Sequence, residues 1–103
     1  MIIEQLSERP PITALYLSGE IDLEARDALR ETLLHIISTG SSVKVDLTAA
    51  TFLDSEALGA LINGYNAARS AGVGFALTGA QGTVRRVLEL TGVLNLAVDP
   101  SEW

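Results

Sequence analysis

The sequence predicts a single α/β domain, residues 1–103, with a mixed sheet of four to five strands and helices mainly on one face. Short apolar runs typical of strands alternate along the chain with longer segments of helical period. This alternation favours parallel strands joined by right-handed crossovers. With 103 residues, 48% of them hydrophobic, the chain is also long and apolar enough to bury one core.

The two expected strands at the N-terminus cover residues 1–6 and 12–17. Both are short and apolar, and Pro10 and Pro11 break the chain between them, which suggests a hairpin. The hairpin would place an antiparallel strand at one edge of an otherwise parallel sheet.

The first helix is predicted to begin at Leu23, where apolar residues start to recur at three- and four-residue steps that continue to Ile37. Asp22 stands immediately before it and is expected to be its N-cap, because a carboxylate accepts the free N–H groups of a first turn. Gly40 is expected to end this helix.

The remaining elements are a strand over 43–48, a helix over 55–71, a strand over 74–78, a helix over 84–91 and a short strand over 94–98. The first of these strands alternates, with Lys44, Asp46 and Thr48 on one side, so one face of the sheet is expected to be only partly covered. Gly72 and Gly92 are expected to end the second and third helices.

The charge balance limits the classes of partner. Thirteen acidic residues oppose seven basic ones, and a net charge of −6 repels phosphate backbones and anionic lipid. We therefore expect no nucleic acid and no membrane surface as partner, and a protein with a basic face is favoured. No apolar run reaches the ~18–20 residues of a membrane span, and no secretory signal is recognisable, so the expected location is the cytoplasm.

Catalytic and metal chemistry finds no support in the sequence. The chain has no cysteine, its single histidine is His35, and no glycine-rich loop ends in Lys-Ser or Lys-Thr. Neither Ser18 nor Ser55 has an evident base to activate its hydroxyl. We expect a protein without catalytic residues, cofactor or metal.

Residues 51–62 carry the strongest functional signal. Asp54 precedes an apolar helical period and is expected to cap it, which leaves Ser55 exposed at the first helical position. A phosphate on Ser55 would meet the positive end of the helix dipole, but also the carboxylates of Asp54 and Glu56. Its charge would alter this surface more than the fold, which suits a switch in binding. The alternative is that Asp54 and Ser55 only start a helix.

Gly59 lies inside the second predicted helix, on an outward stripe with Glu56, Ala60 and Asn63. A glycine there costs ~1 kcal/mol relative to alanine. A flat stripe of small residues permits close approach by another protein, whereas the alternative is that Gly59 packs closely inside this fold.

Three segments in order resemble one known family. The turn over 18–22 resembles a Gly-Glu-Leu-Asp turn, 52–55 followed by Leu58 and Gly59 resembles an Asp-Ser-Ser/Thr-Gly-Leu-Gly signature, and 84–92 resembles a C-terminal helix with its final glycine. Together they resemble the STAS domain, typified by bacterial anti-sigma factor antagonists, over nearly the whole chain.

The resemblance implies a function. In anti-sigma factor antagonists the unphosphorylated domain binds an anti-sigma factor that is also a serine kinase, and phosphorylation of a signature serine ends the binding. That serine matches Ser55, the signature aspartate matches Asp54, and the turn aspartate of the partner surface matches Asp22. The partner-binding residues expected are Asp22, Asp54, Glu56, Gly59 and Asn63.

Two positions depart from the family pattern. Glu56 replaces the second hydroxyl residue, and its carboxylate partly mimics the charge of a phosphate. Ala57 replaces a glycine, and its methyl could obstruct a partner built for glycine. One alternative is therefore a STAS adaptor without phosphorylation, on a transport ATPase or a stress-signalling scaffold. Another is a small enzyme or ligand-binding module, which needs a pocket with converging polar groups.

Overall fold

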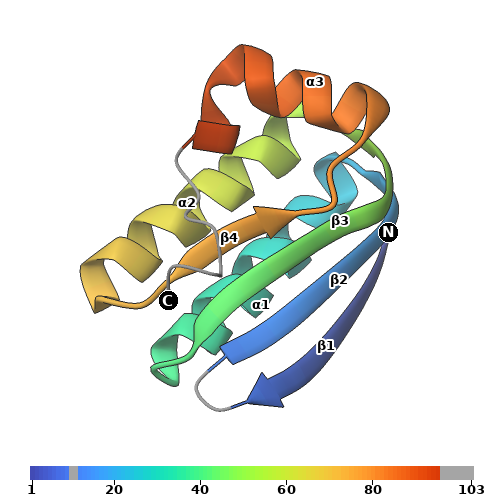
Figure 1. Cartoon of the computed structure of the whole chain (residues 1–103). Coiled ribbons are helices and arrows are strands. Elements are labelled where there is room, and N and C mark those ends of the chain that lie inside the picture. Colours follow the sequence, from blue (N-terminus) through green and yellow to red (C-terminus); the bar gives the residue numbers. More distant parts are fainter. Residues whose placement is uncertain (10–11, 96–103) are drawn as a thin grey trace.

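Four strands form one mixed sheet in the computed structural model, which describes residues 1–9 and 12–95 (Figure 1). Their order is β1-β2-β3-β4, with β1 antiparallel to β2 and the other strands parallel, as predicted. The elements are β1 Ile2–Arg9, β2 Ile12–Ile21, α1 Arg26–Ser38, β3 Ser42–Leu53, α2 Ser55–Ala71, β4 Phe75–Thr78 and α3 Gly82–Thr91, with 3₁₀ helices at Leu23–Ala25 and Val93–Asn95.

Helices α1 and α2 cover one face of the sheet, and α3 lies near the end where β3 and β4 finish (Figure 1). The side chains of Val43, Val45 and Leu47 are buried in the core with those of the two helices. Lys44 and Asp46 alternate with them and are only half-buried. The predicted two-sided character of this strand is confirmed, and the helices leave the other face of the sheet partly open.

Strand β3 continues to Leu53, well beyond the end predicted at Thr48. Its register with β2 shifts after Asp46 and again after Ala50, and at each place β3 has one residue more than its partner. Each such bulge breaks the two-residue alternation of buried and exposed side chains. The pattern beyond Thr48 therefore no longer indicates a strand, although the backbone stays paired.

The first helix begins later than predicted, and the prediction that Asp22 caps it with its side chain is wrong. A 3₁₀ helix, Leu23–Ala25, comes first, and α1 starts at Arg26. The Asp22 side chain makes no capping hydrogen bond; its backbone carbonyl instead accepts from the Ala25 N–H at 3.0 Å. The tight turn that leaves β2 uses the backbone of Asp22 and keeps its carboxylate free of the helix.

The other helix ends agree with the sequence more closely. Helix α2 spans 55–71 as predicted, and Gly40, Gly72 and Gly92 all adopt positive φ after the helices they follow. The strand predicted over 94–98 is not formed at its start, since residues 94 and 95 belong to a 3₁₀ helix. Its remaining residues, 96–98, lie outside the described part of the chain.

At Gly64 the backbone of α2 lies close to side chains of α1 and β4. A Cβ at Gly64 would lie 2.9 Å from Leu33 Cδ1 and 3.1 Å from Phe75 Cε2. The Phe75 ring also packs edge-to-face on Tyr65, with ring centroids 6.3 Å apart. Absence of a side chain at Gly64 therefore sets the spacing between α2 and its neighbours in the core.

Gly64→Ala is expected to lower the free energy of unfolding by about 1–3 kcal/mol, because overpacking displaces core side chains. Gly59→Ala is the matched control on the same helix: its Cβ would meet nothing within 4 Å, so it is expected to raise stability by about 1 kcal/mol. Urea denaturation followed by circular dichroism measures both. Equal changes in the two variants would contradict this account of α2 packing.

Candidate functional site

The ends of β2 and β3 lie side by side and bring two aspartates to one edge of the sheet. Ile21 pairs with Leu53 as the last rung of the parallel ladder, and the Asp54 N–H donates to the Ile21 carbonyl at 3.1 Å. Asp22 and Asp54 therefore leave the sheet from neighbouring points, and both are half-buried. The parallel pairing itself brings together these two predicted site residues.

Asp54 caps α2 as predicted. Its Oδ1 accepts hydrogen bonds from the N–H groups of Glu56 at 3.0 Å and Ala57 at 2.9 Å, from an extended backbone conformation. Ser55 is the first residue of the helix and its side chain is exposed. Within the described residues the Ser55 hydroxyl has no hydrogen-bond partner, so it is available at the surface.

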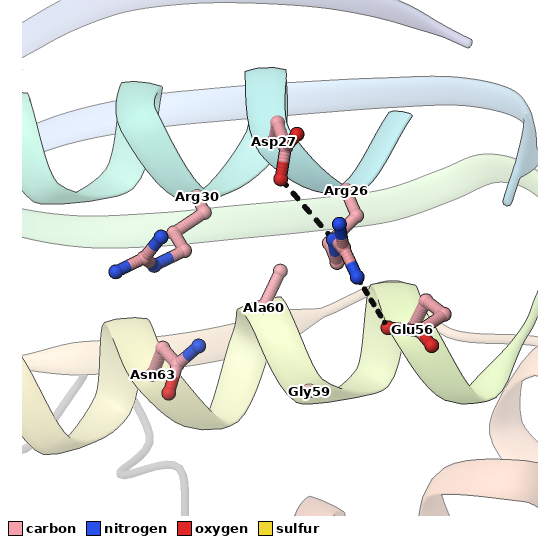
Figure 2. A pocket seen from close by; sticks show the side chains of 7 residues that line it. All are labelled: Arg26, Asp27, Arg30, Glu56, Gly59, Ala60 and Asn63. Atoms are coloured by element: carbon pink, nitrogen blue, oxygen red, sulfur yellow. Dashed lines mark hydrogen bonds and ion pairs between the residues drawn. The ribbon is translucent and has the colours of Figure 1, made fainter. Parts of the chain in front are cut away.

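Glu56 does not stand free beside Ser55, because it forms an ion pair that links the two helices. Arg26 Nη1 lies 2.9 Å from Glu56 Oε2, and Arg26 Nε lies 3.1 Å from Asp27 Oδ1 (Figure 2). The hydrogen bond to Glu56, followed by that to Asp27, raises the pKa of Arg26 above its ordinary value. No local sequence pattern points to Arg26, since its pairing with Glu56 depends on how α1 and α2 are placed.

The outward stripe predicted on α2 is only partly correct. Glu56 and Asn63 are exposed and Gly59 is half-buried, but Ala60 is 1% exposed and faces α1. Close internal packing does not explain Gly59, because a Cβ there would meet nothing within 4 Å; Gly64 has that role instead. Gly59 thus leaves open space beside the exposed part of α2.

Exposed apolar side chains accompany the two aspartates. Phe52, two residues before Asp54, is 48% exposed, and Leu23, directly after Asp22, is 55% exposed. The β3 bulges and the 3₁₀ turn after β2 free these side chains from the core, which hydrophobic periodicity alone does not reveal. Exposed apolar side chains of this kind are typical of surfaces that contact other proteins.

Neither a metal site nor a membrane helix emerges from the described residues. No group of three or more His, Cys, Asp or Glu side chains within them could hold a metal ion. No helix within residues 1–9 and 12–95 is long and apolar enough to cross a membrane.

Asp54→Ala is expected to lower the free energy of unfolding by about 1 kcal/mol, because two N–H groups of α2 lose their acceptor. Ser55→Ala, the neighbouring control, is expected to change stability by less than about 0.5 kcal/mol, since it removes no internal bond. Thermal or urea unfolding of the two variants tests the assignment. A larger loss for Ser55→Ala would show that Ser55, not Asp54, caps the helix.

Comparisons with known proteins agree on one family. The model of the STAS domain matches residues 5–101. An anti-sigma-B factor antagonist of Listeria monocytogenes is 25% identical over 83 residues, which is 80% of this chain and 73% of that protein.

Two solved structures have the same fold. An anti-sigma factor antagonist from Mycobacterium paratuberculosis is 26% identical with a TM-score of 0.74, covering 93% of this chain and 83% of that one. The Bacillus cell fate determinant SpoIIAA in its phosphorylated form is 18% identical with a TM-score of 0.77, covering 95% of this chain and 90% of that one. With the family model spanning nearly the whole sequence, the chain belongs to the STAS domain family.

Proposed function

We propose that this chain is a cytoplasmic anti-sigma factor antagonist that binds an anti-sigma factor with serine kinase activity and is switched off by phosphorylation at Ser55. The observation that carries the proposal is the placement of Ser55. Its hydroxyl is exposed, lacks a hydrogen-bond partner in the described residues, and follows Asp54 at the edge where Asp22 also leaves the sheet. The names of the relatives, antagonists of anti-sigma factors, support the class of partner.

The capping geometry determines what a phosphate on Ser55 would do. Asp54 already accepts the N–H groups of Glu56 and Ala57, so a phosphate would have to displace this cap in order to bind them. It would instead add about −1.5 to −2 charges to the surface beside a carboxylate. Such a change affects a docked partner more than the fold, which is the requirement for a binding switch.

Neither departure from the family signature opposes this proposal. The Glu56 carboxylate is paired with Arg26, which partly offsets the charge that could mimic a phosphate. The Ala57 side chain is 0% exposed, so its methyl lies in the core and does not meet a partner. The surface around Ser55 therefore remains responsive to a new charge.

Ser55→Asp is expected to weaken binding of the purified anti-sigma factor by roughly 100-fold, because a carboxylate enclosed at the interface loses its hydration and is repelled by the neighbouring Asp54. Ser55→Ala is expected to bind like the wild type and to resist phosphorylation. Titration calorimetry gives the affinities, and mass spectrometry of the chain incubated with its partner and ATP locates the phosphate.

The control is Ser70→Asp, which adds the same charge on an exposed residue at the other end of α2 and is expected to leave binding unchanged. Equal binding by Ser55→Asp and Ser55→Ala would refute the switch. A transport ATPase or a signalling scaffold as the partner that co-purifies with the wild type would favour the adaptor alternative.

A further inference from the structure

A groove of about 290 Å³ lies between α1 and α2, one turn along from Ser55 (Figure 2). Its residues are Arg26, Asp27 and Arg30 from α1 and Glu56, Gly59, Ala60 and Asn63 from α2. Glu56, Gly59 and Asn63, which were predicted from sequence to bind a partner, thus line one side of the groove. Residues of α1 line the other side. Figure 2 shows the Arg30 side chain extending from α1 into the space between the two helices, with Asn63 on the α2 side.

The groove has two arginines and two carboxylates, so its charges are equal in number but unevenly paired. Both carboxylates, Asp27 and Glu56, bind the same guanidinium, that of Arg26. Arg30, one helical turn further along α1, forms no ion pair or hydrogen bond with any described residue, and its side chain is exposed. A chain of net charge −6 therefore presents, at this point of its surface, a cation with no ion-pair partner among the described residues.

The shape of the groove admits a side chain from outside. Ala60 is buried and forms the floor of the groove. A Cβ at Gly59 would meet no atom within 4 Å, so the space beside this residue is open. Glycine costs helix stability at this position without any compensating contact inside the fold. The planar guanidinium of Arg30 matches a carboxylate, which can accept two parallel hydrogen bonds, and the Asn63 amide offers a further donor nearby.

We propose that this groove is the receptor for an acidic side chain, Asp or Glu, of the protein partner, with Arg30 as the cation that binds it. This inference rests on the proposed function, because the partner whose binding depends on the state of Ser55 is the same protein that places an acidic side chain in the groove. A single carboxylate fits better than a nucleic-acid phosphate, because Asp27 and Glu56 repel a polyanion approaching the same space. Glu56, the residue after Ser55, makes the groove continuous with the switch.

The test measures binding of the purified partner protein, recovered on the wild-type chain, to Arg30→Glu and Arg86→Glu. Arg86 is the matched control, because it is exposed on α3, away from the groove lining, and the charge change is the same. Arg30→Glu is expected to weaken binding by about tenfold or more and to reduce its salt dependence, whereas Arg86→Glu changes it less than about twofold. Unfolding curves of the two variants are expected to match the wild type.

A charge exchange identifies the carboxylate. Acidic residues on the partner surface are changed to arginine one at a time, and one such variant is expected to restore binding to Arg30→Glu. Equal losses for Arg30→Glu and Arg86→Glu, or no restoring variant, would overturn the proposal.

The outcomes separate the two proposals. If Ser55→Asp weakens binding and Arg30→Glu does not, the proposed switch at Ser55 is supported and the proposed role of the groove is refuted. If Arg30→Glu weakens binding and Ser55→Asp does not, the proposed role of the groove is supported and the proposed switch at Ser55 is refuted. If the wild-type chain binds no protein, both proposals are refuted.

Discussion

The hydrogen bond from the Asp54 N–H to the Ile21 carbonyl is the contact on which the arrangement of the site depends. It extends the parallel ladder of β2 and β3 by one step, so that both strands end at the same place. From that place one strand turns through a 3₁₀ helix into α1 and the other enters α2 directly. Both helices therefore start beside each other, and Arg26 at the beginning of α1 reaches Glu56 in the first turn of α2.

The two glycines inside α2 differ in what they contribute to stability. Gly64 allows the helix to settle onto Leu33 and Phe75, whereas Gly59 contributes nothing to internal packing. The exposed ion pair of Arg26 and Glu56 is worth little to stability, since solvent screens such pairs. It does more to balance the charge beside Ser55, the residue proposed to be phosphorylated.

Much of this organisation could be predicted from the sequence, because it is encoded in local patterns. The period of α2, its cap at Asp54 and the exposure of Ser55 need only neighbouring residues to be recognised. The end of β3 and the start of α1 could not be predicted in this way. Bulges and a 3₁₀ turn shift which side chains face the core, and both depend on pairing with another strand.

Contacts between α1 and α2 escape sequence reasoning for a different reason. Ala60 faces the sequence-distant α1, and its burial depends on the angle at which the two helices cross. The same crossing brings Glu56 of α2 within reach of Arg26, whereas Arg30 has no ion-pair partner among the described residues. Composition gives the net charge of the chain but does not show which cation lacks an ion-pair partner.

The strand order has a consequence for how the chain acquires its structure. Every strand pairs with the one next to it in sequence, so the sheet can grow from β1 toward β4 in the order of synthesis. The N-terminal hairpin needs only local contacts, whereas β3 must close a loop that contains all of α1 before it pairs. Ser55 follows that closure directly. The surface position of Ser55 depends on the pairing of β2 and β3 just before it, so an enzyme that recognises this geometry would act on the folded domain and not on nascent chains.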